Sequence, residues 1–428
     1  MLNLQGFNPW WETGTVPQLL IGKKRRLLGE LMKYIDLRQM QILSGIRRAG
    51  KTTLMFQVVN ELLKHDVDPF NIMYFSFDEE VEDMNDIIDS YETNVLKHSI
   101  RQVERIYIFL DEVQKAKSWS DKVKQIYDMN PNIKIFISGS AAIGIKKGTR
   151  ESLAGRFFDF AVDPLGFDEY LSFMDVEIDK SREGVFERQI KQHLNRFLET
   201  GGFIEILEFD AKQRERYFKE GLLERVVYRD LPDIFPIRTP ELLYRLLRII
   251  AERPGMYLDY KNIAGDLGYD QRTIGEYISY LENALLLVRI YNYSASRLTS
   301  EKKMKRAYLS SPAFSLAFSG DLDRGPLLEQ FFINDLKVRF FSRTPQRDEV
   351  DIVLTKDDKV IPVEIKIRKK IGREEYKPVL KFLRKYGLNQ GYVISDSTES
   401  TVTDGAFKVH TVPYWKYWTI HKLLSGEN

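Results

Sequence analysis

The chain has 428 residues, a length that favours two or three domains. Of these residues 43% are hydrophobic and 29% charged, and this balance excludes a largely disordered protein. It contains no cysteine, which excludes disulfide bonds and thiolate chemistry, and it has neither a signal-like leader nor a long apolar stretch, so we expect a cytoplasmic protein without a membrane span. The 64 basic side chains nearly balance the 62 acidic ones, so a nucleic-acid partner would have to be met by a local basic patch.

The first part of the chain alternates short apolar runs with amphipathic stretches, which is typical of a parallel sheet covered by helices. We expect strands at residues 40–44, 71–77, 105–110, 133–138 and 158–162. Together with the helices between them they predict an α/β domain over residues 1–165. Helical periodicity then dominates from 168 to 251, and it predicts a lid or connector over residues 166–236.

Three closely spaced prolines, Pro232, Pro236 and Pro240, mark the next boundary. Helices expected at 241–252, 260–267 and 272–287, followed by a strand at 287–293, predict a winged-helix domain over residues 237–306. Short strands and helices resume after that point and predict a small α/β domain over residues 307–428.

A glycine-rich loop lies between the first expected strand and the helix after it. Residues 45–52 match the pattern G-x-x-x-x-G-K-[ST], in which backbone N–H groups turn inward around phosphate oxygens at a helix N-terminus. Lys51 would reach the β and γ phosphates and Thr52 would hold Mg²⁺, so we predict a site for ATP or ADP with Mg²⁺. The predicted nucleotide-binding residues are Gly45, Ile46, Arg47, Arg48, Ala49, Gly50, Lys51, Thr52 and Thr53.

The strand expected at 105–110 is followed by two carboxylates, Asp111 and Glu112. We expect Asp111 to support Mg²⁺, and Glu112, on the opposite side of the strand end, to deprotonate the attacking water. The strand at 71–77 lies between the loop and this strand in sequence, which favours the ATPase branch with an extra central strand and a catalytic glutamate. Ser140 follows the next strand, and we predict that it contacts the γ-phosphate; the alternative is a tight turn.

These motifs, together with Gly139-Ser140, Ala154-Gly155-Arg156 and the segment 164–170, resemble the AAA-plus ATPases fused to a DUF4143 domain. The resemblance spans most of the chain and implies ATP hydrolysis. The chain departs from the pattern at Ala141, where another serine is common, and at Ile204, where a proline is usual. In AAA-plus proteins an arginine from a neighbouring subunit or from the lid stabilises the transition state, so the resemblance implies that Arg156 or Arg229 binds the nucleotide in a homo-oligomer. Surface salt bridges are the alternative for both arginines.

The helices expected at 260–267 and 272–287 are joined by a tight turn, as in a helix-turn-helix. Gln271, Arg272 and Thr273 open the second helix, and we predict that they contact DNA because base contacts concentrate at that end. Basic residues that would bind phosphates from the wing are Arg297, Lys302, Lys303, Lys305 and Arg306. The alternative is a packing domain that relays the nucleotide state, with these residues solvated.

Residues 349–354 and 360–367 flank a polar turn and predict a β-hairpin. A turn that is symmetric about residues 357 and 358 pairs residues whose numbers sum to 715, so Asp351 lies opposite Glu364, with Lys366 on the same face. Two such carboxylates repel unless a cation or a proton joins them, and the arrangement suits Mg²⁺-dependent phosphodiester cleavage in which Lys366 positions or activates water. These residues resemble the PD-(D/E)xK nuclease core, and the resemblance implies Glu329 as a further metal ligand. A solvated hairpin face is the alternative.

We therefore predict an α/β protein with a P-loop NTPase parallel sheet and helical lid, a winged-helix domain and a small restriction-nuclease-like domain. Our first hypothesis is an ATP-hydrolysing enzyme that acts on DNA. The alternatives are an ATP-dependent signalling switch without nuclease activity and an ATPase that remodels protein. A metal held by Asp351 and Glu364 would support the first hypothesis, whereas a hairpin face covered by other residues would support the switch.

Overall fold

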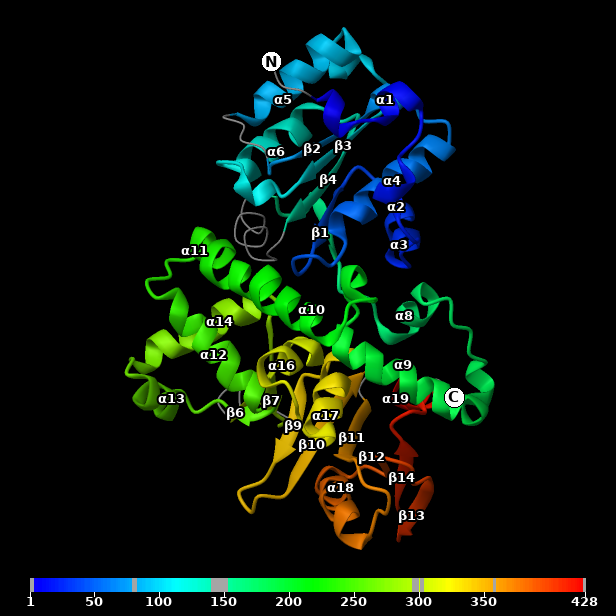
Figure 1. Ribbon diagram of the computed structural model, residues 1–428, viewed down its shortest axis with the longest axis vertical. Coiled ribbons are helices and arrows are strands. Elements are labelled where there is room, and N and C mark those ends of the chain that lie inside the picture. Colours follow the sequence, from blue (N-terminus) through cyan, green and yellow to red (C-terminus); the bar gives the residue numbers. More distant parts are fainter. Residues whose placement is uncertain are drawn as a thin grey trace. The chain divides into compact units, whose positions relative to one another are not determined.

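The computed structural model describes residues 4–78, 83–139, 153–294, 300, 304–356 and 359–425. The chain divides into two units (Figure 1). Unit 1 comprises Met1–Leu165, Asp230–Pro236 and Asn283–Leu285, and unit 2 comprises Gly166–Arg229, Ile237–Glu282 and Leu286–Asn428. None of the helices in the described part of the chain is long and apolar enough to cross a bilayer.

Unit 1 is built on a five-stranded parallel sheet with the order β2-β3-β4-β1-β5. Its strands are β1 (Met40–Ser44), β2 (Ile72–Ser76), β3 (Ile106–Asp111), β4 (Ile133–Gly139) and β5 (Phe157–Ala161). The predicted parallel sheet is confirmed. An additional central strand, β4, lies between β1 and β3, as the favoured ATPase branch requires, and the strand at 71–77 forms the edge strand β2.

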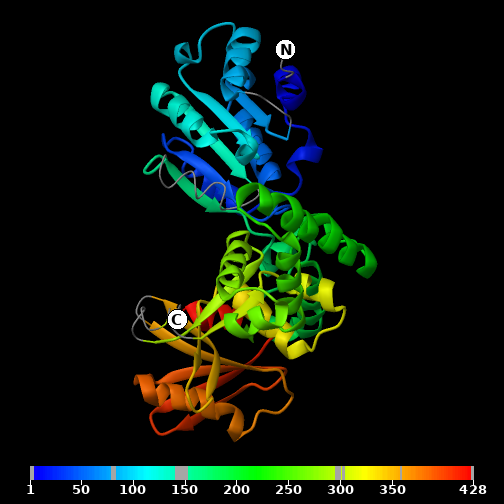
Figure 2. The same cartoon turned by 90° about the vertical axis from the view of Figure 1, so that its left-hand side faces the viewer.

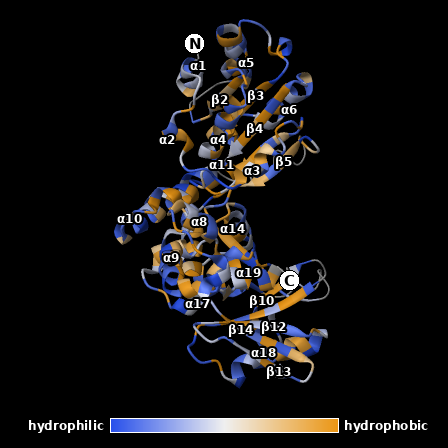
Figure 3. Cartoon of the chain, turned by 90° about the vertical axis from the view of Figure 1, so that its right-hand side faces the viewer, coloured by the Kyte–Doolittle hydropathy of each residue, from blue (hydrophilic) through white to orange (hydrophobic). Residues whose placement is uncertain are grey.

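Helices cover both faces of this sheet (Figures 1 and 2). Every residue of β1 to β4 is buried, as continuous apolar runs between two helical layers require, and Figure 3 shows hydrophobic residues along these strands. The α-helices in the described residues of unit 1 are α1 (Trp10–Thr13), α2 (Gln18–Ile21), α3 (Leu27–Met32), α4 (Lys51–Lys64), α5 (Met84–Tyr91), α6 (Trp119–Met129) and α11 (Leu231–Ile234).

The N-terminal segment covers the edge of the sheet at β2. The side chain of Asn8 bonds both backbone groups of Tyr74, at 2.7 and 3.0 Å, and the indole nitrogens of Trp10 and Trp11 donate to the carbonyl of Ile72. These side chains satisfy backbone groups that an edge strand otherwise leaves unpaired.

A buried lysine on β4 anchors the segment that leads into β1. The ammonium of Lys134 donates to the carbonyls of Tyr34, Leu37 and Gln39 at 2.8, 2.8 and 2.6 Å. Replacing Lys134 by Met removes all three bonds, each of which contributes about 1 kcal/mol or more because the donor is charged. We expect urea unfolding to show a free energy of unfolding lower by roughly 3 kcal/mol. Lys33→Met, at a lysine that is 66% exposed, is the control, and equal stability of the two variants would contradict the assigned role.

Unit 2 contains one nine-stranded mixed sheet with the order β13-β14-β12-β11-β10-β9-β7-β8-β6. Its strands are β6 (Met256–Tyr257), β7 (Leu287–Asn292), β8 (Lys305–Leu309), β9 (Phe340–Arg343), β10 (Glu349–Lys356), β11 (Lys359–Lys366), β12 (Gln390–Ser395), β13 (Ser400–Asp404) and β14 (Phe407–Pro413). Its α-helices in the part of the chain that the structure describes are α8 (Phe167–Phe173), α9 (Glu187–Thr200), α10 (Ala211–Arg216), α12 (Pro240–Glu252), α13 (Tyr260–Leu267), α14 (Gln271–Asn283), α16 (Pro312–Ser319), α17 (Arg324–Asp335), α18 (Arg373–Tyr386) and α19 (Tyr417–Ser425).

The strands that follow α14 belong to the same sheet as the C-terminal strands. β7 pairs with β8 on one side and with β9 on the other. The boundary predicted between residues 306 and 307 therefore falls inside β8 and separates no folding unit. A sequence pattern marks where strands occur, but it does not say which strands pair across a long connection.

The predicted hairpin is confirmed in its register. Ile352 pairs with Val363 and Val353 with Pro362, so the residue numbers sum to 715 as the symmetric turn requires. Helices α12, α13 and α14 also occur where the helical pattern predicts them. Helix α14 ends at Asn283, four residues before its predicted end, because Leu285 has a left-handed conformation (φ 59°) where the chain turns into β7.

Candidate functional site

The glycine-rich loop connects the end of β1 to the start of α4, in the strand-to-helix context that its motif requires. A Cβ atom on Gly45 would lie 2.1 Å from the carbonyl oxygen of Val162, so a larger residue there would displace the backbone. Gly50 has a φ of 90°, which favours glycine, and it directly precedes α4. Each of the two positions therefore requires glycine for a different steric reason.

Lys51 is buried at this loop, with 5% of its surface exposed. Its ammonium donates to the carbonyls of Gly45 and Ile46 at 3.1 and 3.0 Å. Burial lowers the pKa of Lys51, and the negative charges of Glu112 and Asp111 oppose that shift. The ammonium thus stands inside the loop among acidic groups, where it is placed to bind phosphate oxygens.

Asp111 closes the site from the end of β3. Its carboxylate accepts hydrogen bonds from the hydroxyls of Thr52 at 2.6 Å, Tyr74 at 2.8 Å and Ser138. Burial raises the pKa of Asp111, whereas the bonds from Thr52 and Tyr74 lower it. Sequence reasoning missed Tyr74 and Ser138, because only the strand order reveals that β2 and β4 flank β3.

The pair of Thr52 and Asp111 fits a Mg²⁺ ion. Both offer oxygen ligands, and Mg²⁺ in nucleotide sites is held by one or two protein oxygens together with phosphates and water. In the described part of the chain, no group of three or more His, Cys, Asp or Glu side chains is arranged to hold a metal. A site that borrows most of its ligands from a nucleotide needs no such group.

Glu112 follows Asp111 and turns away from the strand in a left-handed conformation, with φ 53° and ψ 37°. Such a conformation is uncommon for a residue other than glycine and is concentrated at functional sites. The carboxylate of Glu112 accepts a hydrogen bond of 2.7 Å from the side chain of Gln114. Gln114 is a further residue that the sequence analysis did not assign, and it orients the predicted base.

Three further residues of the predicted nucleotide-binding set are Arg47, Arg48 and Ser140. Arg47 lies in the loop and pairs with Asp230 at 3.3 Å within unit 1, and Arg48 adopts a positive φ of 64°. Ser140 lies outside the described residues.

Arg156 does not contact the nucleotide site of its own chain. It precedes β5 at the amino end of the sheet, where its carbonyl accepts from the N–H of Met40, while the loop lies at the other end of β1, about 16 Å away for a five-residue strand. Its guanidinium pairs with Asp128 through bonds of 2.9 and 3.1 Å. Within its own chain Arg156 therefore forms a surface salt bridge, and its binding of the nucleotide in a homo-oligomer stays a prediction.

The residues predicted to contact DNA open helix α14. The side chain of Arg272 is 89% exposed and pairs with Glu276 one turn later at 2.9 Å. Asp270 caps this turn by accepting from the N–H and the hydroxyl of Thr273 at 2.9 and 2.5 Å. Of the basic residues expected in the wing, Arg297, Lys302 and Lys303 lie outside the described residues. Arg306 is buried, so the expectation of a solvent-facing phosphate contact was wrong for it.

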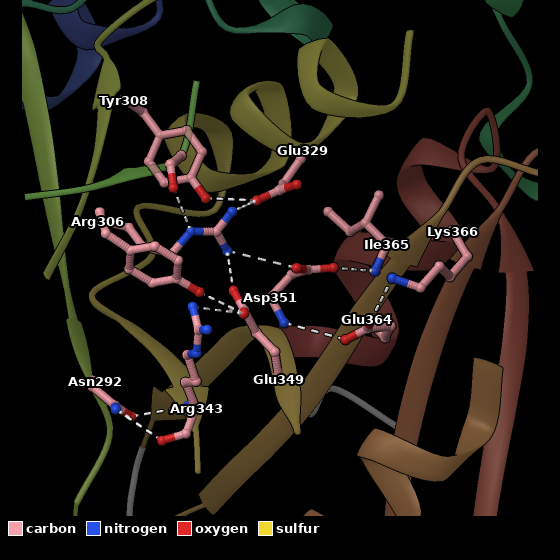
Figure 4. A network of polar contacts seen from close by, with 12 residues as sticks. Asn292, Arg306, Tyr308, Glu329, Arg343, Glu349, Asp351, Glu364, Ile365 and Lys366 are labelled. Atoms are coloured by element: carbon pink, nitrogen blue, oxygen red, sulfur yellow. Dashed lines mark hydrogen bonds and ion pairs between the residues drawn. The ribbon is translucent and has the colours of Figure 1, made fainter. Parts of the chain in front are cut away.

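A second cluster of charged residues lies in unit 2 (Figure 4). The carboxylate of Asp351 accepts from the N–H of Ile365 at 2.9 Å, and the carboxylate of Glu364 accepts from the N–H of Asp351 at 3.3 Å. Lys366 pairs with Glu364 at 2.5 Å. Burial and the neighbouring charge of Asp351 raise the pKa of Glu364. The fold thus brings together the three residues that the hairpin register predicted.

Glu329 also joins this cluster, but its contacts are to Arg306 and Tyr308. Both donate to the same carboxylate oxygen at 2.6 Å. The guanidinium of Arg306 also lies 3.2 Å from Glu349 and 3.6 Å from Asp351. Burial acts to lower the pKa of Arg306, but Tyr308 and the surrounding carboxylates outweigh it and raise that pKa above the usual range. An arginine therefore lies among the acids where the nuclease resemblance implies a metal.

Similar proteins cover most of the chain. The uncharacterized protein MJ1544 of Methanocaldococcus jannaschii is 24% identical over 95% of this chain and 94% of its own length. MJ1637 of the same organism is 26% identical over 85% of this chain and 82% of its own length. A Haemophilus influenzae protein is 24% identical over 63% of this chain and 66% of its own length.

Solved structures give weaker similarities. The Walker-type ATPase PABY2304 of Pyrococcus abyssi covers 69% of this chain, and the match covers 95% of that protein, with 15% identity and a TM-score of 0.42. The ORC2 protein of Aeropyrum pernix covers 75% of this chain, and the match covers 93% of that protein, with 14% identity and a TM-score of 0.37.

Three family matches follow one another along the chain. Residues 37–171 match an AAA domain, residues 191–322 match a domain of unknown function (DUF8612), and residues 324–417 match a domain of unknown function (DUF4143). The AAA match contains the loop, Lys51, Thr52, Asp111 and Glu112. The chain therefore carries an AAA-type ATPase domain, which supports ATP binding and hydrolysis, followed towards the C-terminus by a DUF4143 domain.

Proposed function

We propose that the protein is an ATP-hydrolysing switch that binds DNA, with its nucleotide site in unit 1 and its DNA contacts on helix α14 of unit 2. The observation that carries the proposal is the convergence of Lys51, Thr52, Asp111 and Glu112 at the carboxyl end of the parallel sheet. Each has the chemistry that its role in phosphoryl transfer needs.

In this proposal Lys51 binds the β and γ phosphates through its buried ammonium, and the N–H groups at the start of α4 add further donors. Thr52 and Asp111 hold Mg²⁺, which neutralises phosphate charge when it is bound. Glu112 orients the attacking water and takes its proton onto the carboxylate that Gln114 fixes.

DNA binding rests on the exposed opening of α14. Its first turn presents Gln271, Arg272 and Thr273 after a helix and a tight turn, and base or phosphate contacts concentrate at this end of a recognition helix. The side chain of Arg272 forms an exposed ion pair with Glu276, which costs little to break.

Arg272→Ala should weaken binding to double-stranded DNA about tenfold and, if the arginine contacts a phosphate, reduce the salt dependence of the affinity by about one ion. Fluorescence anisotropy over a salt titration measures both quantities. Arg216→Ala is a matched control, because that arginine is 78% exposed and has the same type of ion pair with Glu220. Equal affinities for the two variants would remove α14 from the DNA-binding surface and would favour a protein partner.

Cleavage of DNA by Asp351, Glu364 and Lys366, with Glu329 as a further metal ligand, is the finer proposal that the sequence offers. The closeness of the hairpin residues supports it. The position of Arg306 opposes it and favours the switch, in which the C-terminal region has no catalytic role.

A further inference from the structure

Arg306 enters the acidic cluster of unit 2 from β8, whereas the acids come from elsewhere in the fold (Figure 4). Glu329 lies on α17, Glu349 and Asp351 lie on β10, and Glu364 lies on β11. The arginine thus reaches carboxylates that are between 23 and 45 residues away along the chain.

The contacts of Arg306 fix its guanidinium in place. One terminal nitrogen donates to Glu329 at 2.6 Å, the other lies 3.2 Å from Glu349 and 3.6 Å from Asp351, and Nε donates to the carbonyl of Gly255 at 2.8 Å. The rings of Tyr308 and Phe341 lie 5.4 and 5.7 Å from the guanidinium carbon, close enough for cation–π attraction. With only 9% of the side chain exposed, the arginine is part of the interior.

A divalent ion in the same place would conflict with this arrangement. An arginine cannot lose its proton in a protein, so its positive charge stays among the carboxylates. A Mg²⁺ ion needs oxygen ligands at about 2.0–2.1 Å in an octahedron, and it would stand beside that charge while sharing the same oxygens. Conversely, buried carboxylates are costly unless a cation or a proton joins them, and Arg306 is a cation beside Glu329 and Asp351, as Lys366 is beside Glu364.

We infer that Arg306 is the resident cation of the acidic cluster in unit 2 and that it excludes a divalent metal from Glu329, Asp351 and Glu364. The cluster then joins β8, which carries Arg306, to α17 and to the hairpin strand β10. Removing the guanidinium converts the cluster into a divalent-metal site. This inference concerns unit 2 alone and depends neither on ATP hydrolysis nor on DNA binding.

The test measures Mn²⁺ binding to the nucleotide-free full chain by electron paramagnetic resonance of free Mn²⁺. Four proteins are compared: the wild type, Asp351→Asn, Arg306→Gln and the double variant. The wild type and Asp351→Asn should bind Mn²⁺ equally. Arg306→Gln should gain one ion with at least tenfold higher affinity than the wild type shows, and the double variant should lose it. Any Mn²⁺ that binds at Thr52 and Asp111 binds equally in all four proteins, so it does not affect the differences between them.

Two results would overturn the inference: Mn²⁺ binding by the wild type that Asp351→Asn abolishes, or an Arg306→Gln variant that folds and gains no ion. Arg306→Lys keeps the positive charge and should bind no additional Mn²⁺, which separates the charge from the shape of the side chain. If Arg306→Gln does not fold, the comparison of wild type with Asp351→Asn still decides the question. Asp351-dependent cutting of DNA by the wild type with Mg²⁺ would also contradict the inference, and the proposed ATPase would be unaffected.

Discussion

Replacing Glu112 by Gln is expected to slow ATP hydrolysis by about 10²- to 10⁴-fold while ATP remains bound, because the amide keeps the shape of the side chain but cannot accept a proton. The nearby ammonium of Lys51 and the Thr52–Asp111 pair stay intact in this variant. Single-turnover hydrolysis of ATP measures the chemical step, and equilibrium binding of a fluorescent ATP analogue measures the affinity.

Glu104→Gln provides a matched control for this prediction. Glu104 is an exposed carboxylate that lies just before β3, at the opposite end of the strand from Glu112. This variant should hydrolyse ATP at the wild-type rate. If Glu112→Gln did the same, another group would have to be the base, and Glu112 would be a turn residue whose left-handed backbone serves the geometry of the strand end.

Lys51→Ala is expected to abolish tight nucleotide binding, with a dissociation constant for ATP at least about 100-fold higher. Charge-assisted hydrogen bonds contribute about 1.5–3 kcal/mol each, and Lys51 is placed to make them to two phosphates. Losing both bonds therefore lowers the affinity for ATP by more than about 100-fold. Isothermal titration calorimetry with ATP and Mg²⁺ measures the affinity directly.

Lys64→Ala is the control for Lys51→Ala, because Lys64 ends the same helix and its side chain is 61% exposed. It should bind ATP as the wild type does. Circular dichroism must show that Lys51→Ala is folded, since Lys51 is buried. A folded Lys51→Ala variant with wild-type affinity would refute the assignment of the loop as the phosphate site.

The sequence was most informative where local pattern decides the structure. The loop at 45–52 and the acids Asp111 and Glu112 were assigned from a short motif at the junctions of strands, and the fold places them together at the ends of β1 and β3. The register that places Asp351 beside Glu364 followed from the symmetry of one turn, because a hairpin register is set by its own loop. Each of these inferences uses residues that are close in sequence or fixed by a short connection.

Contacts between distant segments could not be predicted in this way. Tyr74 and Ser138 reach Asp111 because β2 and β4 flank β3, and strand order is not encoded in the period of any one strand. Arg156 lies beside Asp128 at the amino end of the sheet, although its neighbours in sequence resemble a nucleotide-binding motif.

By itself, the sequence determined the elements, the phosphate loop, the two acids after β3 and the register of the C-terminal hairpin, since all of these depend on local periodicity and turn geometry. Only the tertiary structure decided that β8 joins the C-terminal sheet and brings Arg306 among Glu329, Glu349 and Asp351. The physical reason is that buried carboxylates are costly without a neighbouring cation or a proton, and the sequence shows which acids are present but not which positive charge the fold places beside them.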